Sequence, residues 1–275
     1  MTDALLRQPR RVRHELKFRR ARVEAVEQLT PVLKRIVLTG DELEGFFSPG
    51  FDDHVKIFPT PRDEPLVLPT LGPDGPVFPE PRPVARDYTP RAFDSVNRRL
   101  TIDFAVGHGG PATAWAEDAR PGDELGLGGP RGSFLIPTSF AEHLLVGDEA
   151  AIPAIARRLE ELPATARAIA CIEVNDAGGE LDLPSPANVE IVWVHRNGGP
   201  RGRPDRTRRL RRLRVGGAAL RADRRLHVPP GGDRSRARPG QPGREPDRQG
   251  PGRPAPQPVG DVRRDRRAGP GPLRP

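Results

Sequence analysis

The chain of 275 residues has a formal net charge of +8 that is unevenly distributed. Residues 201–275 contain 22 Arg against 7 Asp and Glu, whereas the first 200 residues contain 23 Lys and Arg against 30 Asp and Glu. The basic character therefore belongs to the last quarter of the chain and predicts no basic patch on a folded body. One cysteine excludes an intrachain disulfide, and no apolar run reaches the ~18–20 residues of a membrane span. We expect a cytoplasmic protein with no membrane partner.

The first half of the chain has the pattern of an all-β domain. Residues 1–20 are highly charged, and we expect them to be flexible. Residues 21–140 contain short apolar segments that are separated by Gly, Pro and Asp, and residues 100–106 alternate between apolar and polar side chains. Regularly spaced strands of this kind predict an antiparallel β-barrel, from which the Pro-rich residues 60–83 form an excursion loop.

After residue 140 the pattern changes to that of an α/β domain. A strand, a helix and two further strands are predicted in turn, near residues 143–146, 150–162, 168–174 and 189–194. This order is typical of a doubly wound α/β domain, whose ligand site lies at the carboxyl ends of the strands, here near Gly147. Cys171 lies within an apolar strand, so we expect a buried thiol and no nucleophile.

The last 75 residues depart from both patterns. They contain 22 Arg, 13 Pro and 12 Gly, and no Lys, Ile, Phe, Tyr, Trp or Met. So few large apolar side chains cannot compensate for the entropy lost on ordering, and we expect a disordered tail over residues 200–275. The α/β domain predicted over residues 141–199 is then incomplete, because a parallel sheet needs more strands and helices on both faces.

Residues 86–91 (Arg-Asp-Tyr-Thr-Pro-Arg) hold the only tyrosine of the chain. The Arg86 guanidinium can bind a phosphate through two parallel hydrogen bonds. The Tyr88 ring can stack on a planar heterocycle, and the Thr89 hydroxyl can bond a ring nitrogen. These three groups together suit a nucleotide that carries a fused aromatic ring, a flavin in particular. The alternative is a structural strand with one exposed arginine.

Three further segments have features of nucleotide binding. Residues 110–116 (Gly-Pro-Ala-Thr-Ala-Trp-Ala) predict a loop that enters a helix, where backbone amides and the Thr113 hydroxyl could hold a pyrophosphate. Residues 128–133 (Gly-Gly-Pro-Arg-Gly-Ser) predict a tight turn that lies near a phosphate or closes the barrel. Residues 147–155 follow a strand and open a helix. The structural alternatives are an N-cap role for Thr113 and electrostatic stabilisation of the helix start by the acidic pair in residues 147–155.

In this order, the four segments resemble the siderophore-interacting proteins, which are flavin-dependent ferric-siderophore reductases of the ferredoxin-reductase fold type. The resemblance covers about residues 20–197 and includes residues 29–40 and 53–56. It implies an FAD-binding barrel, a pyridine-nucleotide domain and the one-electron reduction of chelated Fe(III) to weakly held Fe(II). It also implies NADPH as the electron donor, with NADH or ferredoxin as alternatives. No protein nucleophile and no protein-bound metal are expected.

The resemblance assigns roles to single residues by position. Arg86 is expected to pair with an FAD phosphate, Tyr88 to stack on the isoalloxazine and Thr89 to lie near its reactive nitrogen. Ala112 and Thr113 are expected to cradle the pyrophosphate. Further contacts are expected to FAD from Asp103, His108 and Gly110, and to the nicotinamide nucleotide from Gly147, Asp148 and Glu149.

The substrate side and the end of the chain are less defined. Lys56 and the 60–83 loop are our candidates for contacts with the ferric siderophore. The family ends with a strand, a helix and a Gly-Tyr-Trp-Arg-like motif that this sequence lacks, so we hypothesise that the reading frame is lost near residue 200. An inactive, truncated family member is therefore an alternative, and an incomplete donor domain predicts weak NAD(P)H oxidation even when FAD binds.

A protein that binds nucleic acid through the arginine-rich tail is the other alternative. The tail lacks the aromatic or Gly-rich interleaving that is typical of such segments, so we expect no nucleic-acid partner. We expect the chain to be a monomer.

Overall fold

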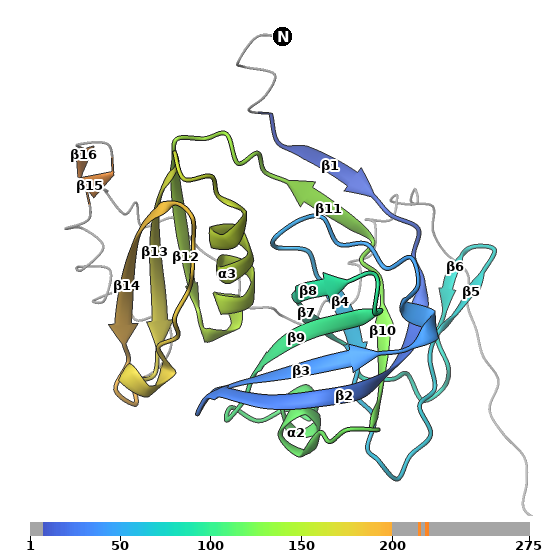
Figure 1. Cartoon of the computed structure of the whole chain (residues 1–275). Coiled ribbons are helices and arrows are strands. Elements are labelled where there is room, and N and C mark those ends of the chain that lie inside the picture. Colours follow the sequence, from blue (N-terminus) through green and yellow to red (C-terminus); the bar gives the residue numbers. More distant parts are fainter. Residues whose placement is uncertain (1–7, 200–213, 216–217, 220–275) are drawn as a thin grey trace, which may run out of the picture. The chain divides into compact units, whose positions relative to one another are not determined.

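The computed structural model in Figure 1 describes residues 8–199, 214–215 and 218–219. The short strands β15 (Arg214–Val215) and β16 (Ala218–Ala219) pair with each other. The rest of the tail, for which disorder and a lost reading frame were predicted, lies outside the described residues. None of the helices in the described part of the chain is long and apolar enough to cross a membrane.

Seven antiparallel strands form one curled sheet in the order β7-β4-β10-β2-β3-β9-β8. Their bounds are β2 (Phe18–Thr30), β3 (Leu33–Thr39), β4 (Val55–Phe58), β7 (Arg86–Tyr88), β8 (Pro90–Asp94), β9 (Arg99–Ala105) and β10 (Glu124–Gly128). This sheet confirms the predicted antiparallel barrel fold. Pairing of β3 with β9 sets Ile36 opposite Ile102 and Leu38 opposite Leu100, and all four are completely buried. Burial of each such side chain contributes about 1.5–3 kcal/mol, so the alternation in residues 100–106 defines the inner face of the barrel.

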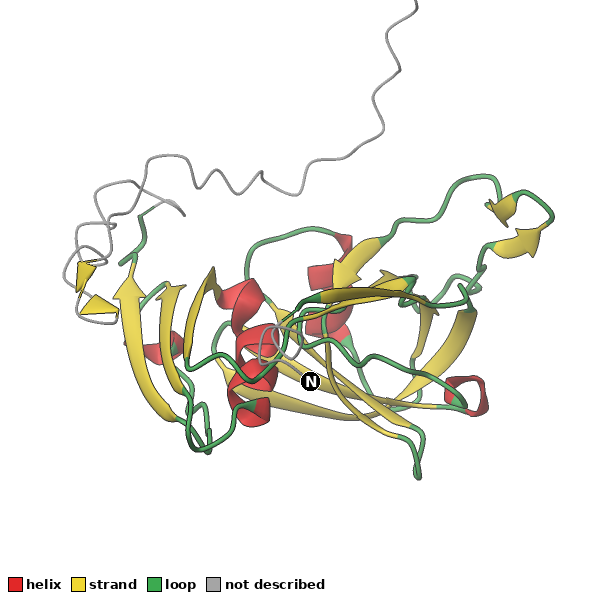
Figure 2. Cartoon of the chain, turned by 90° about the horizontal axis from the view of Figure 1, so that it is seen from above, coloured by secondary structure: helices red, strands yellow, loops and turns green. Residues whose placement is uncertain are grey.

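The predicted excursion loop contains a small hairpin. Strands β5 (Thr70–Gly72) and β6 (Gly75–Val77) pair with each other, and Figures 1 and 2 both show them projecting from the curled sheet. A single 3₁₀ turn, η1 (Asp41–Leu43), follows β3 and buries Leu43 in the barrel core.

Helix α2 (Pro111–Asp118) covers one end of the barrel core. The residue before it, Gly110, has φ +104°, a conformation that favours glycine, and Pro111 supplies the fixed φ of a first helical residue. Ala112 and Ala116 then point inward and are buried in the barrel core. The sequence of residues 110–116 thus specifies both where the helix begins and which face it buries.

Three parallel strands form a second sheet in the order β12-β13-β14, with bounds Glu142–Asp148, Arg167–Val174 and Asn188–His195. Helix α3 (Ile152–Glu161) lies beside this sheet in both views (Figures 1 and 2). It packs on the sheet through a stripe formed by Ile152, Ile155 and Leu159. Short 3₁₀ turns, η2 (Glu149–Ala151) and η3 (Ala177–Gly179), follow β12 and β13. The order of strand, helix, strand and strand confirms the predicted α/β pattern.

Cys171 lies in the middle strand β13, where it is buried as expected. Burial disfavours the thiolate and raises the pKa of the thiol to about 11. Because the thiolate is the reactive form, the group is poorly suited to act as a nucleophile.

The N-terminal segment differs from the prediction of a flexible stretch over residues 1–20. Strand β1 (Arg10–Arg13) pairs with β11 (Gly132–Leu135), and β2 already begins at Phe18. Gly132 allows this pairing, because a Cβ at that position would lie 2.6 Å from the carbonyl oxygen of Val12. The expectation is therefore wrong for these strands: backbone pairing orders them although most of their charged side chains are exposed.

Candidate functional site

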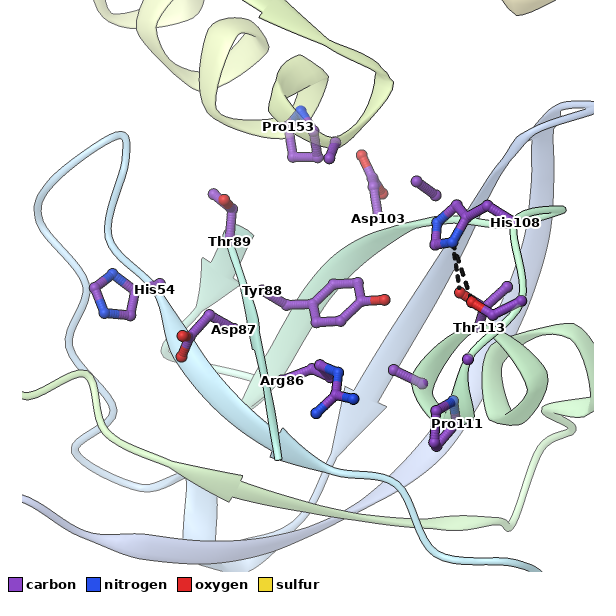
Figure 3. A pocket seen from close by; sticks show the side chains of 15 residues that line it. His54, Arg86, Asp87, Tyr88, Thr89, Asp103, His108, Pro111, Thr113 and Pro153 are labelled. Carbon is purple, nitrogen blue, oxygen red and sulfur yellow. Dashed lines mark hydrogen bonds between the residues drawn. The ribbon is translucent and has the colours of Figure 1, made fainter. Parts of the chain in front are cut away.

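A cavity of about 520 Å³ lies where β7, the end of β9 and the start of α2 meet. Eight of the residues singled out from the sequence line it: Arg86, Tyr88, Thr89, Asp103, His108, Gly110, Ala112 and Thr113 (Figure 3). These residues come from three separate segments, so the fold gathers what the sequence only orders along the chain. We take this cavity as the candidate site.

The Tyr88 ring is half-buried and projects into the cavity (Figure 3). One side of it packs on the barrel core, where the Phe104 ring centroid lies 4.5 Å away. Burial raises the pKa of the phenol, so the hydroxyl stays protonated at neutral pH. The side chain therefore offers a fixed, uncharged aromatic surface.

Arg86 lies on the same strand, two residues earlier, and is exposed. Its Nη1 donates a hydrogen bond to the carbonyl oxygen of Ala85 at 2.8 Å, and no carboxylate of the described residues pairs with it. A guanidinium that is oriented but lacks a counter-charge suits an anionic ligand. Figure 3 shows it in the same cavity as Pro111, at the start of α2.

The loop before α2 presents backbone to the cavity. Gly109 and Gly110 have φ of +74° and +104°, and a Cβ on either would contact no atom within 4 Å. Conformation, and not crowding, therefore requires glycine, and the space beside the loop is open. Pro111 has no N–H, so the free amides of the first helical turn are those of Ala112 and Thr113. Such amides at a helix start bind anions.

Thr113 is the third residue of α2 and is almost completely buried. The N-cap position belongs to Gly110, so the N-cap alternative for Thr113 is wrong. The Thr113 hydroxyl lies 3.3 Å from Nδ1 of His108, which fixes the imidazole at the edge of the cavity (Figure 3).

Asp103 lines the cavity, but its carboxylate is already paired with Arg35. Its side chain is 1% exposed, and Arg35 donates to both oxygens, from Nε at 2.8 Å and from Nη2 at 2.9 Å. The hydrogen bonds to Asp103 also raise the pKa of Arg35. The aspartate thus ties β9 to β3 and supports the cavity wall.

The structure does not bring Gly147, Asp148 and Glu149 into the cavity. A Cβ on Gly147 would lie 2.3 Å from Cβ of Ala151, so close packing of the following turn requires glycine here. Asp148 Oδ1 accepts a hydrogen bond from the amide of Ala150 at 3.0 Å and caps η2, a structural role close to the electrostatic one predicted as the alternative for this residue.

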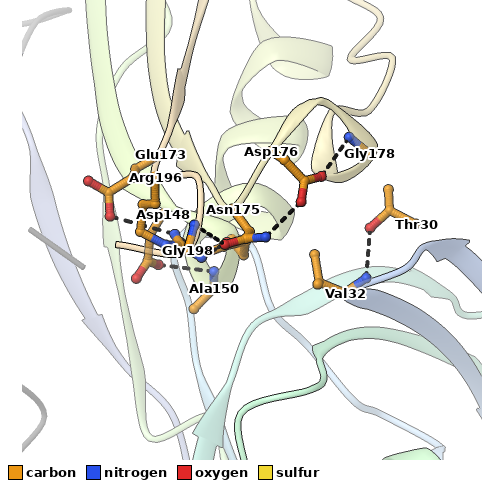
Figure 4. A network of polar contacts seen from close by, with 11 residues as sticks. Thr30, Val32, Asp148, Ala150, Glu173, Asn175, Asp176, Gly178, Arg196 and Gly198 are labelled. Carbon is orange, nitrogen blue, oxygen red and sulfur yellow. Dashed lines mark hydrogen bonds and ion pairs between the residues drawn. The ribbon is translucent and has the colours of Figure 1, made fainter. Parts of the chain in front are cut away.

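Glu149 is buried in an ion pair with Arg196 at the carboxyl ends of the strands. Figure 4 shows Arg196 there, beside Glu173 and Asp148. Arg196 Nη1 donates to Glu149 at 2.9 Å and also lies 3.5 Å from Glu173. These contacts raise the pKa of Arg196. The pair fixes the turn that precedes α3, and this turn does reach the cavity, because Ala150 and Pro153 line it.

Lys56 and the turn over residues 128–133 lie outside the cavity. Lys56 Nζ donates to Asp87 Oδ1 at 2.9 Å on the exposed side of β4. In the turn, Ser133 is buried and donates to Asp53 Oδ2 at 2.7 Å. His14 Nε2 lies 2.7 Å from the same hydroxyl, and donates to it because the serine proton is already used. The turn therefore holds β1 on the barrel.

His54 lines the cavity and was missed as a site residue. It lies beside Thr89 because β4 and β7 pair with Val55 opposite Tyr88. The sequence carried no signal for this register. A second cavity, of about 540 Å³, lies between residues 59–66 and α2, and Pro111 lines both cavities.

Comparisons with known proteins agree on one family. Residues 22–134 match the siderophore-interacting FAD-binding domain, and residues 140–228 match the siderophore-interacting protein family. The second match extends past residue 200, so the similarity does not end where the composition changes.

Individual relatives are similar to this chain over most of its described residues. The NADPH-dependent ferric-chelate reductase of Escherichia coli is 46% identical over 192 residues, which cover 68% of this chain and 75% of the relative. The ferric vibriobactin reductase of Vibrio cholerae is 36% identical over 167 residues, covering 60% of this chain and 62% of the relative. A siderophore utilization protein from T. fusca superposes with a TM-score of 0.70 at 41% identity, covering 76% of this chain and 80% of that structure.

Proposed function

Because the chain belongs to the siderophore-interacting proteins, we propose that it is an FAD-dependent oxidoreductase that reduces ferric siderophores and releases Fe(II), with electrons from NADPH. The observation that carries the proposal is the cavity in which Arg86, Tyr88 and Thr89 meet the start of α2. The chain spans 75% and 62% of the two curated relatives, so the activity of a whole relative is part of the proposal.

FAD fits the residues that line the cavity. The Tyr88 ring offers a planar surface, Arg86 offers a cation without a carboxylate partner among the described residues, and the glycines before α2 leave open space. When bound, FAD supplies two-electron uptake from a nicotinamide and one-electron delivery to iron, which side chains cannot supply.

The residues of the cavity would bind and orient the cofactor. Arg86 and the free amides of Ala112 and Thr113 hold the pyrophosphate, to which the positive end of the α2 dipole also contributes. Tyr88 would hold the isoalloxazine by stacking, and Thr89 would offer its hydroxyl to the reactive part of the ring system. Pro111 lines both cavities, so the residues of the second cavity would be available to hold the adenosine half of the cofactor.

The nicotinamide nucleotide would approach from the side of α3. Ala150 and Pro153 are the residues of that side that line the cavity. Gly147, Asp148 and Glu149 then act indirectly: they shape and fix the turn that carries Ala150, and a direct contact with the nucleotide is not required of them. Siderophore contacts from Lys56 and the 60–83 loop, ferredoxin as a donor, a monomeric state and a cytoplasmic location stay predictions.

The test is flavin retention followed by turnover. Purified protein is loaded with FAD and desalted, and its visible absorbance is recorded. We expect a retained flavin band in the wild type and in an Arg99→Ala control, whose arginine pairs with Glu24 away from the cavity. We expect loss of the band in an Arg86→Ala/Tyr88→Ala double variant. A folded wild-type protein that retains no flavin would contradict the proposal.

Turnover distinguishes the enzyme from its inactive alternative. Ferric chelate is added to loaded protein with NADPH, and Fe(II) is trapped with a chromogenic chelator. Fe(II) formation with NADPH supports the full proposal. Fe(II) formation only from protein that was reduced with dithionite and then desalted anaerobically would support the FAD site and the iron step, and would show that the donor part is impaired.

A further inference from the structure

One arginine of helix α3 that has no part in the proposed cofactor contacts donates hydrogen bonds to two segments of the barrel. Arg157 Nη1 donates to the carbonyl oxygen of Pro90 at 2.7 Å and to Ser48 Oγ at 3.2 Å, and its Nη2 donates to the Ser48 carbonyl oxygen at 2.9 Å. The side chain is half-buried, and desolvation lowers its pKa. A planar guanidinium is suited to this task, because its fork can bond two backbone segments at once.

Both of these segments lead into the candidate site. Pro90 directly follows Tyr88 and Thr89, and Ser48 lies in the loop that ends at His54. This loop is itself fixed: the buried Asp53 Oδ2 accepts hydrogen bonds from the Gly50 amide, the Ser48 hydroxyl and the Ser133 hydroxyl, at 2.9, 3.1 and 2.7 Å. Arg157 therefore binds to two segments that lead directly into the cavity wall, one of which is fixed by Asp53.

On the side of α3, the Arg157 contact is also connected to the cavity. Pro153, in the first turn of α3, lines it, and Figure 3 shows this residue across the cavity from Tyr88 and Thr89. Arg157 follows four residues later, so both side chains lie on the same face of the helix. A displacement of α3 at Arg157 would therefore displace Pro153 as well.

An ion pair from the neighbouring turn supports the same contact. Arg91 forms two hydrogen bonds with Glu160, one of them at 2.9 Å, and its Nε lies 3.9 Å from Asp103 Oδ2. Because the Glu160 side chain is 40% exposed, this pair contributes less than a buried one. The hydrogen bonds of Arg157 to backbone carbonyls are the part of the contact that solvent screens least.

We propose that Arg157 is a positioning residue that sets the distance between the nicotinamide and the flavin by holding α3 against Ser48 and Pro90. The inference rests on the proposed function and extends it. Hydride transfer needs reacting atoms about 3–3.5 Å apart, and a misplacement of about 1 Å can reduce the rate about 100-fold. Arg157 touches neither ring, so its effect is on the geometry of the donor side and not on FAD affinity.

The test compares Arg157→Ala, Arg157→Lys and the control Arg167→Ala. Arg167 lies on β13 of the same sheet and pairs only with Glu142 and Glu190 among the described residues, at 4.0 and 3.8 Å. Flavin reduction by NADPH is followed anaerobically by stopped flow in FAD-loaded protein. We expect the limiting rate to fall at least about tenfold in Arg157→Ala and less in Arg157→Lys, since an ammonium cannot bond both segments in the same way. The control should stay within about twofold.

Two further readouts separate positioning from a general structural role. FAD affinity, and the reoxidation of dithionite-reduced protein by ferric chelate, should each stay within about threefold of the wild type, because neither step needs the donor side. A fall in FAD affinity as large as the fall in the reduction rate would overturn the inference. So would an unchanged reduction rate in Arg157→Ala.

Hydrogen exchange covers the case in which the wild-type chain does not react with NADPH. In that case the donor part of the proposed function fails, and positioning is judged from amide exchange in residues 150–157. Faster exchange there in Arg157→Ala, with unchanged exchange in β3 and β9, supports the inference. Equal exchange in the variant and the wild type overturns it.

Discussion

The ring of Tyr88 packs on the ring of Phe104, with centroids 4.5 Å apart and planes tilted by 36°. Phe104 is completely buried, and Trp115 of α2 lies 5.8 Å from it, so the three rings join the barrel core to the cavity wall. The tyrosine ring is held by the core while it lines the cavity (Figure 3). A ring that is already fixed loses little entropy when a planar ligand stacks on it.

Removal of this ring should weaken FAD binding. We expect Tyr88→Ala to lower FAD affinity about 10- to 100-fold, which corresponds to about 1.4–2.7 kcal/mol, since stacking and buried apolar area are both lost. Tyr88→Phe removes only the hydroxyl and should stay within about threefold. Titration of apoprotein with FAD, followed by the change in flavin fluorescence, measures both. Equal affinity of the Ala variant and the wild type would show that Tyr88 does not contact the flavin.

The Arg86 guanidinium should contribute affinity without contributing stability. We expect Arg86→Ala to lower FAD affinity about tenfold and to weaken its dependence on salt, because a charge contact with phosphate is screened by ions. Arg86→Lys should recover only part of the loss. Because the side chain is exposed, the free energy of unfolding should change by less than about 0.5 kcal/mol. Arg99→Ala is the matched control; the same loss of affinity in both variants would contradict the assignment.

The pair of Asp103 and Arg35 should behave in the opposite way. We expect Asp103→Asn to lower the free energy of unfolding by about 2–4 kcal/mol, since it removes the charge partner of an arginine at a site where the carboxylate is 1% exposed. Urea unfolding followed by circular dichroism measures the change. Asp118→Asn, at the exposed end of α2, serves as the control. A stability equal to that of the wild type would show that the pair does not support the cavity wall.

Local patterns predicted most of the elements that frame the site. Residues 100–106 alternate between apolar and polar side chains, which predicts a strand with one buried face. Leu100, Ile102 and Phe104 are indeed completely buried. The helical pattern over residues 150–162 matches α3, whose regular part is shorter because η2 precedes it. Arg86, Tyr88 and Thr89 could be singled out because their spacing along a strand places three different groups near one ligand.

Pairings between distant segments could not be predicted in the same way. His54 reaches the cavity through the register of β4 with β7, and β1 becomes ordered by pairing with a strand more than a hundred residues away. Glu149 follows a strand as a nucleotide contact would, yet Arg196, 47 residues later, buries its carboxylate in an ion pair. Each outcome depends on a partner that the local sequence does not contain.

Protonation of His143 should destabilise the fold below neutral pH. Burial, and next the nearby positive charge of Arg158, lower the pKa of His143 in the folded chain. The folded state therefore favours the neutral imidazole, and the stability this contributes is present above the unfolded pKa of about 6.5 and is lost as pH falls through the lower folded value. We expect the free energy of unfolding to decrease between pH 7 and pH 5. The decrease should be smaller in His143→Gln, and equal slopes in the two proteins would contradict the assignment.

The thiol of Cys171 should be unreactive in the folded chain. With its pKa raised from 9.0 to about 11 by burial, only about one molecule in a thousand carries the thiolate at pH 8. We expect an aromatic disulfide reagent to label the native protein slowly at pH 8, and to label it at the rate of a free thiol once urea unfolds it. The raised pKa also makes the free energy of unfolding depend on pH, because the folded state favours the protonated thiol. This contribution is fully present below the unfolded pKa of 9.0 and is lost as pH rises through the folded value. Cys171→Ser is the blank for labelling, and rapid labelling of native protein would show that β13 is accessible.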